Sequence, residues 1–180
     1  VYVADKHDHR TQKFDASGNR FGDVFEIGAS IASSSKIDVA LTALADGGFV
    51  AAFTNGANAG DSWFERYDST GTAVQTSLWD TLLNASTEDD PAIASTGSGF
   101  LIAETDASGS SEIWVQKRDV NGNIVNLNGS MFLQANGDAA AGAQTGPSIA
   151  FDAANNQFAV SWIDNSAGKV MMRVFNADGT

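Results

Sequence analysis

The sequence predicts an all-β chain that is built from a repeat of about 50 residues. Three observations support this prediction. A short turn motif occurs four times, a strand motif centred on Phe recurs in step with it, and no apolar stripe of helical spacing extends beyond two turns. Clusters of Gly, Asn and Asp separate the apolar segments, as expected for short strands joined by turns.

The turn motif places Gly three residues after an Asp or Asn. Its copies read KFDASG, RYDSTG, KRDVNG and VFNADG, with the acidic or amide residue at Asp15, Asp68, Asp119 and Asn176. In a type I turn this side chain accepts a backbone N–H two residues on, and the Gly adopts the left-handed conformation that closes a hairpin. A calcium loop needs several converging oxygens, whereas each motif offers one carboxylate at most. We therefore expect hairpin turns here.

The strand motif reads GGFVAAF, SGFLIAE and NQFAVSW, with its Phe at Phe49, Phe100 and Phe158. The distance from each Phe to the next turn residue is nearly constant, at 19, 19 and 18 residues. The distance from a turn residue to the next Phe varies more, which indicates a packed unit with one variable loop. Small and apolar residues fill both alternating phases, so we expect these strands to be buried on both faces.

One complete unit contains four expected strands, in the order 91–96, 99–105, 112–119 and 123–133. Four strands at this period are the signature of a β-propeller blade, whereas a β-sandwich lacks such a repeat. We predict a β-propeller of about 50-residue, four-stranded blades, of which about three and a half are present. The expected units are residues 1–36 (partial), 37–87, 88–143 and 144–180 (partial), forming one domain or a piece of a larger propeller.

Both ends of the chain fall inside a motif, which leaves three interpretations open. The chain is a piece of a longer propeller, two copies complete a seven-bladed ring, or a four-bladed ring closes by pairing the first strands with the last. An open end exposes strand edges that aggregate, so we favour a piece of a larger assembly. The expected partners are therefore other chains or further blades of the same protein.

Composition excludes several classes of protein. With 10 basic and 22 acidic residues the net charge is −12, which argues against nucleic acid and anionic membranes as partners. No apolar run approaches the length of a membrane span, so membrane insertion is not expected. The absence of Cys excludes disulfides and thiolate metal sites. A nucleophile elbow, a P-loop and a dinucleotide fingerprint are also missing.

The repeated units resemble the propeller-type repeats of large secreted bacterial proteins, including adhesins and hemolysin-type calcium-binding proteins of the RTX class. The matching residues include the Pro-x-Ile-Ala motif from Pro91, the Gly-Gly-Phe-Val motif from Gly47, and the Gln-x-Phe-Asp motif from Gln12. The sequence departs from this pattern at Glu104, where the repeat has an aromatic residue, and it lacks the calcium-binding nonapeptide. The resemblance implies an extracellular or cell-surface location and a non-catalytic role, and it implies no ligand.

Candidate binding residues lie outside the regular repeat positions. Trp79 and Asp80 precede a loop, and Asp106 lies in another, so these three are the candidates for contact with a glycan or a protein. Glu88, Asp89 and Asp90 form an acidic run that could hold calcium as a cofactor, although a solvated loop is the simpler interpretation. Asp5, His7 and His9 would share one face of a strand and could hold zinc, with a solvated strand edge as the simpler alternative.

The sequence therefore favours a non-catalytic binding, adhesion or scaffold module of a secreted or cell-surface bacterial protein. Two alternatives remain open. One is a polysaccharide-acting propeller hydrolase or lyase, for which Glu104 is the conspicuous carboxylate, and the other is a structural surface-layer or filament subunit. The sequence assigns no catalytic residue.

Overall fold

The computed structural model describes most of the chain. The described residues are 2–5, 10–15, 17–20, 22–23, 25–29, 31, 35–56, 60–79, 87–107, 109–137 and 142–180. These residues form β-strands, turns and connecting segments, and none of them is helical, which confirms the all-β prediction. His7, His9, Asp80 and the loop that Asp80 begins lie outside the described residues.

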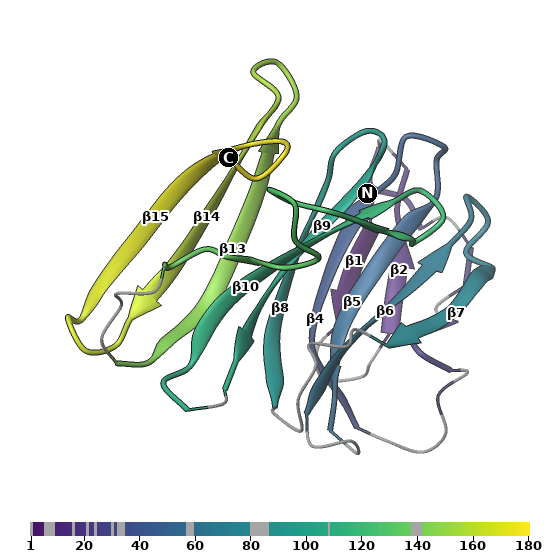
Figure 1. Cartoon of the computed structure of the whole chain (residues 1–180). Helices are drawn as coiled ribbons and strands as arrows, with labels where there is room; N and C mark the ends of the chain where they lie inside the picture. Colours follow the sequence, from purple (N-terminus) through teal and green to yellow (C-terminus); the bar gives the residue numbers. More distant parts are fainter. Residues whose placement is uncertain are drawn as a thin grey trace.

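The described strands form four antiparallel sheets that follow one another in chain order (Figure 1). The first sheet contains β1 (Tyr2–Asp5), β2 (Arg10–Lys13) and β3 (Phe25–Glu26). The second contains β4 (Lys36–Ala43), β5 (Phe49–Asn55), β6 (Asp61–Tyr67) and β7 (Ala73–Trp79). The third contains β8 (Glu88–Ser95), β9 (Gly99–Asp106), β10 (Glu112–Asp119), β11 (Ile124–Val125) and β12 (Leu133–Gln134). The fourth contains β13 (Gln144–Asp152), β14 (Gln157–Asp164) and β15 (Lys169–Asn176).

The sheets pack face to face, with a hydrophobic cluster between each neighbouring pair. Strand β5 shows how one strand serves two interfaces. Its Phe49 and Phe53 belong to the cluster shared with the first sheet, whereas Val50 and Ala52 belong to the cluster shared with the third. The opening strands β4, β8 and β13 contact one another in sequence, so the sheets fan out from these strands.

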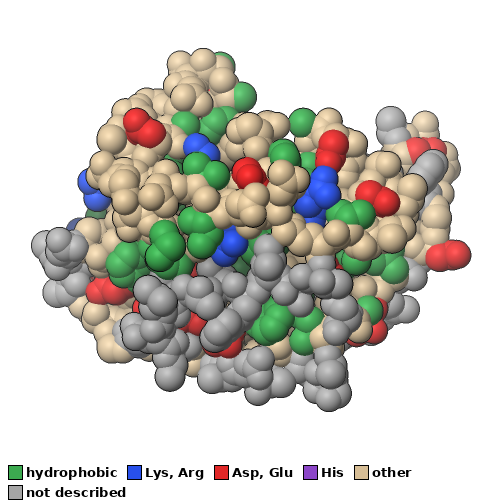
Figure 2. All heavy atoms as spheres, turned by 45° about the vertical axis from the view of Figure 1, so that its right-hand side comes forward, with side chains coloured by type: hydrophobic (Ala, Val, Ile, Leu, Met, Phe, Trp, Pro, Cys, Tyr) green, Lys and Arg blue, Asp and Glu red, His purple; other side chains and the backbone are tan. Residues whose placement is uncertain are grey.

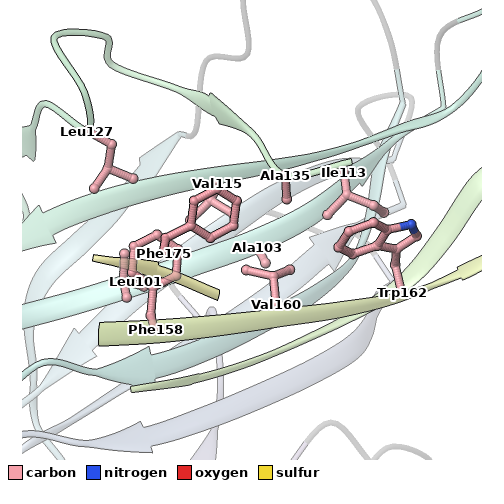
Figure 3. Packing of buried hydrophobic residues seen from close by; sticks show 10 residues of the cluster. All are labelled: Leu101, Ala103, Ile113, Val115, Leu127, Ala135, Phe158, Val160, Trp162 and Phe175. Carbon is pink, nitrogen blue, oxygen red and sulfur yellow. The ribbon is translucent and has the colours of Figure 1, made fainter. Parts of the chain in front are cut away.

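Middle strands β5 and β9 are buried along both faces, as the sequence predicts, but β14 is not. Phe158, Val160 and Trp162 point toward the third sheet, and in Figure 3 they rise from one strand toward Val115 and Ile113. The alternate side chains of β14 are only partly buried or exposed, because among the described residues no further sheet covers them.

The four turn motifs adopt the predicted hairpin geometry. In each of them the Gly has positive φ and its N–H donates to the carbonyl of the Asp or Asn three residues earlier. At Asp119, for example, carboxylate Oδ1 accepts the N–H groups of Asn121 at 2.8 Å and Asn123 at 2.9 Å. The fourth turn differs because Asn176 carries no carboxylate, and Asp178 accepts the N–H of Thr180 instead.

The outer strand of the third sheet is split. We expected a single strand over residues 123–133, but β11 and β12 are two short pieces that both pair with β10. A local turn separates them, in which Leu127 and Ser130 form an isolated bridge. Leu127 is fully buried in the cluster shared with the fourth sheet, so this turn contributes to the core.

Candidate functional site

Two adjacent sheets bring the sequence-predicted residues to one edge, which we call the loop edge. Trp79 is the last residue of β7 in the second sheet, where its backbone pairs with that of Trp63. Asp106 is the last residue of β9 in the third sheet, and Glu88 is the first residue of β8. Because neighbouring strands are antiparallel, the end of β9 and the start of β8 lie at the same edge.

The two loop edges also meet across the interface. Thr87, directly before β8, packs against Gly60, directly before β6, so closely that a Cβ on Gly60 would lie 2.5 Å from the Thr87 methyl group. The start of β6 and the end of β7 belong to the same edge of the second sheet. The structure therefore places Trp79, Asp106 and the Glu88–Asp90 run at one edge of the molecule.

Three carboxylates form a row across the loop edge of the third sheet. Glu88 on β8 pairs with Asp106 on β9, which pairs in turn with Glu112 on β10, and paired residues project from the same face. Glu88 is buried, whereas Asp106 and Glu112 are partly exposed. The Glu112 carboxylate accepts bonds from Ser110, Gln134 and Asn136, so it links the turn before β10 to β12 and the residues after it.

Glu104 occupies the strand position that Phe53 and Trp162 take in the neighbouring repeats. It points toward the second sheet, as Phe100 and Ile102 do on the same strand, and it is buried. Its backbone pairs with that of Trp114. Glu104, which departs from the aromatic pattern of the repeat, is therefore a carboxylate buried between two sheets and not one exposed at the surface.

Near the start of the opening strands, Asp38 joins Asp90 as an acidic residue that the sequence reasoning missed. Asp38 on β4 and Asp90 on β8 both have positive φ and both lie where the register of their strand shifts, as Gly146 does on β13. The three positions correspond in the repeat. Residues 90–95 read DPAIAS and correspond to residues 38–43 in the preceding unit, which read DVALTA, and this alignment would have identified Asp38.

The carboxyl group of Asp89 is affected by the charges of both of these acids. Partial burial raises the pKa of the Asp89 carboxyl, and the negative charges of Asp90 and Asp38 raise it further. The loop edge is therefore locally electronegative where β4 and β8 meet. Such a site favours a cation or a hydrogen-bond donor over an anion.

Metal binding gains no geometric support from the described part of the chain. Within it, no group of three or more His, Asp or Glu side chains is arranged to hold a metal ion. This includes Glu88, Asp89 and Asp90, the residues of the calcium hypothesis. The zinc hypothesis falls on His7 and His9, which lie outside the described residues.

Buried polar groups also connect the first two sheets. Glu65 on β6 is buried, and its Oε2 accepts the N–H of Gly28 at 2.8 Å and the hydroxyl of Tyr67. Burial, followed by the bond to Glu65, raises the pKa of Tyr67 well above its usual range. This carboxylate holds the loop after β3 against the second sheet, which is a structural task.

The fourth sheet leaves one apolar face uncovered, and we call it the end face. It consists of alternate residues on β14 and β15 that share one side of the sheet by their register: Ala159, Ser161, Ile163, Val170, Met172 and Val174. The opposite side of the same strands contacts the third sheet. In Figure 1 the fourth sheet stands at the left of the fan.

Acidic side chains show no comparable concentration on the face drawn in Figure 2. Asp and Glu side chains are scattered there among neutral and apolar ones, with Lys and Arg between them. The described residues contain no helix that is long and apolar enough to cross a membrane.

Comparison with protein-family models and with curated proteins finds no match. Solved structures do resemble the chain. One is a chain of a nidogen/laminin complex, with a TM-score of 0.50 and 16% identity over 95% of this chain and 55% of that one. Another is an endo-1,4-beta-xylanase from Bacteroides thetaiotaomicron VPI-5482, with a TM-score of 0.50 and 9% identity over 98% of this chain and 69% of that one. The chain thus spans about half the length of the first, and at these identities the likeness concerns the fold alone.

Proposed function

We propose that the chain is a sector of a β-propeller that serves as a non-catalytic binding, adhesion or scaffold module of a secreted or cell-surface bacterial protein. The observation that carries this proposal is the loop edge, where Trp79, Asp106 and the Glu88–Asp90 run lie at the same end of the strands of two adjacent sheets. Propellers bind ligands through loops at the ends of their strands, and this edge is such a surface.

Support for the propeller comes from the way the sheets are joined. Four antiparallel sheets follow one another in chain order, and their opening strands β4, β8 and β13 lie next to one another. Blades of a propeller are arranged in the same way around an axis. The resemblance to the nidogen/laminin chain supports the same fold.

A non-catalytic role is supported by what the conspicuous carboxylates do. The turn residues bond their own backbone, Glu65 fixes a loop, and Glu112 orders a turn. Glu104 is buried between two sheets. At the loop edge Asp90 is exposed and Asp89 and Asp106 are partly exposed, so these carboxylates can accept hydrogen bonds from a partner.

Binding screens test the proposal directly. We expect the protein to bind glycans on an array or a surface protein in a pull-down, and Trp79→Ala and Asp106→Asn each to weaken that binding at least about tenfold, as hot-spot residues do. Val120→Ala is the control, because Val120 lies in the turn after β10 at the opposite edge. Absence of binding to any glycan or protein, or equal loss in the control, would contradict the proposal.

A polysaccharide-acting hydrolase or lyase is the second candidate, because carboxylates line up as Glu88, Asp106 and Glu112 beside Glu104. The xylanase resemblance suggests xylan as the first substrate to assay. Glycosidases need two accessible carboxyl groups flanking the bond, whereas Glu88 and Glu104 are buried. Release of reducing sugar from xylan that Glu104→Gln abolishes would favour the enzyme over the binding module.

A structural surface-layer or filament subunit is the third candidate, and the uncovered end face favours it. Such a subunit is expected to contact other chains extensively. If calcium instead joins chains at the loop edge through Glu88, Asp89 and Asp90, the mass in solution will fall when a chelator is added. An unchanged mass would show that calcium does not hold the chains together.

A further inference from the structure

We infer that Asn128 is a self-modification site, at which the backbone nitrogen of Gly129 displaces ammonia from the Asn128 side-chain amide. Water then opens the ring that forms, so that Asn128 becomes Asp or its isomer isoaspartate. Three observations support the inference: the different restraints on the four Asn-Gly pairs of the chain, the exposure of the Asn128 turn, and its position between the third and fourth sheets.

The reaction needs only the chain itself, solvent base and water. The backbone nitrogen after the Asn loses its proton and forms a bond to the side-chain carbonyl carbon, Cγ. The bond from Cγ to the side-chain nitrogen breaks, and that nitrogen leaves as ammonia. Water adds to either carbonyl of the resulting succinimide ring, which gives Asp or isoaspartate. Gly is the most favourable following residue, because it has no side chain to shield its nitrogen and its backbone rotates freely.

Two of the four Asn-Gly pairs have a Gly nitrogen that is held in place. The N–H of Gly56 donates to the carbonyl of Ser35 at 2.9 Å, and the preceding Asn55 is only 1% exposed. The N–H of Gly122 donates to the carbonyl of Asp119 at 3.0 Å. Such an N–H must give up its hydrogen bond before its nitrogen can attack, so we expect both pairs to react slowly.

The third pair is held by its Asn side chain. Asn136 Oδ1 accepts the N–H of Ile113 at 3.0 Å, and its Nδ2 donates to the Glu112 carboxylate. These two bonds fix the amide at both of its polar atoms. Its Cγ cannot turn toward the following nitrogen unless both bonds break.

The fourth pair, Asn128-Gly129, has neither restraint. Both residues are exposed, and among the described residues neither the Asn128 side chain nor the Gly129 N–H has a hydrogen-bond partner. A side chain added at Gly129 would meet nothing within 4 Å. Backbone bonds between Leu127 and Ser130 close the turn and leave the two reacting groups open to water. Cγ can therefore approach the nitrogen without the loss of any side-chain hydrogen bond.

The Asn128 turn also joins the third sheet to the fourth. The N–H of Asn128 donates to the carbonyl of Asp178, and a Cβ on Gly179 would lie 2.9 Å from the Cβ of Leu127. Leu127 is buried in the cluster shared by the two sheets (Figure 3). Both products place a new carboxylate near Asp178, and isoaspartate also lengthens the backbone at this close contact. Modification should therefore loosen the fourth sheet on the third.

The first experiment follows the folded protein in mildly alkaline buffer by peptide mass spectrometry, which reports the change from amide to acid at each Asn. We expect Asn128 to convert at least about tenfold faster than Asn55, Asn121 or Asn136, because its two reacting groups are free to align. Conversion of Asn128 no faster than that of the three held residues would overturn the inference.

Two controls separate the effect of the fold from that of the sequence. In urea the four Asn-Gly pairs should convert at similar rates, because the hydrogen bonds that hold three of them are lost. In the folded protein Asn128→Gln should remove the rapid release of ammonia, since the longer side chain closes a less favourable ring. Asn121→Gln is the matched control and should leave that release unchanged. Loss of the rapid release in Asn121→Gln instead would also overturn the inference.

The second experiment tests the consequence for packing. Converted protein is separated from unconverted protein by ion exchange, and we expect it to unfold at a lower urea concentration. Asn128→Asp adds the charge without lengthening the backbone, so its midpoint should shift less than that of the isoaspartate form. Asn128→Gln incubated in the same way should show no shift. An unchanged midpoint in fully converted protein would contradict the loosening of the two sheets.

Discussion

At the scale of single residues, three of the turn motifs show why a carboxylate three residues before a Gly need not be a ligand site. The Oδ1 atom of Asp15, Asp68 and Asp119 accepts the N–H groups two and four residues later. Each carboxylate thus satisfies backbone donors that would otherwise be left to water at the hairpin end. The residue serves the chain itself, and its recurrence marks the repeat.

Removing one of these carboxylates should destabilise the fold. We expect Asp119→Ala to lower the free energy of unfolding by about 1–2 kcal/mol, because two backbone N–H groups lose a charged acceptor. Chemical denaturation measures the effect. Val120→Ala in the same turn should change stability by less than about 0.5 kcal/mol, and an equal effect of both substitutions would argue against the hydrogen-bond explanation.

Acid should weaken the protein through the same residues. Hydrogen bonds from turn side chains and backbone N–H groups lower the pKa of six carboxyls below 3.8, namely Asp15, Asp68, Asp119, Asp152, Asp164 and Asp178. A lowered folded-state pKa contributes stability above the unfolded value, which is lost as the pH falls through the folded value. Asp89 acts in the opposite direction, because its raised pKa favours the fold at low pH.

The measurable consequence is a difference between variants. Between about pH 5 and about pH 3, the wild type should lose more unfolding free energy than Asp119→Asn, which has one such carboxylate fewer. Urea titrations at a series of pH values provide this comparison. Identical losses in the two proteins would show that the Asp119 carboxylate does not couple folding to protonation.

At the scale of single elements, the equivalent strands β9 and β14 show that similar sequences can have different burial. Both carry the Phe motif, and both alternate side chains toward two faces. Strand β9 lies between two sheets and is buried on both sides, whereas β14 is covered on one side only. Position in the stack, rather than the strand's own sequence, determines this difference.

Truncations on the two strands should differ accordingly. Leu101→Ala removes a side chain that is buried between the third and fourth sheets, and we expect it to lower the free energy of unfolding by about 2–4 kcal/mol. Ile163→Ala on the end face should change the stability of the monomer by less than about 1 kcal/mol, because Ile163 is already 44% exposed. The measurement is denaturant unfolding at low protein concentration. Equal losses would mean that the end face is covered within one molecule.

At the scale of the whole molecule, apolar faces and net charge act against each other. Each chain carries a net charge of −12, so two copies repel one another at long range. The central rungs of the end face on β14 and β15, in contrast, carry no charge. If chains assemble through this face, as the surface-layer or filament candidate requires, assembly should depend on how strongly salt screens the repulsion.

Under the surface-layer or filament candidate, salt should strengthen assembly. Raising the ionic strength from about 0.01 M to about 0.15 M shortens the screening length from about 30 Å to about 8 Å, so the protein concentration at which chains assemble should fall. Sedimentation velocity at several salt concentrations measures this concentration. Weaker assembly in salt would indicate that charge pairs, rather than the apolar end face, hold the chains together.

Much of the local structure could be predicted from the sequence because its determinants are local. The Asp-to-Gly spacing specifies the hairpins, and the small and apolar residues around Phe49, Phe100 and Phe158 specify strands, although only the first two of these strands are buried on both faces. The loop edge was only partly predictable. Trp79 and Asp106 were selected one by one, and their placement at one edge required knowing which strands are antiparallel neighbours.

The sequence alone determined the all-β class, the repeat and the chemistry of the turns, because each depends on residues close together in the chain. Only the tertiary structure decided that Glu104 lies inside an interface, that Asp38 and Asp90 both influence Asp89, and that the fourth sheet keeps an apolar face open. These properties arise from contacts between sheets some 50 residues apart in sequence. Burial is a property of what lies opposite a side chain, and a strand carries no local record of whether another sheet covers it.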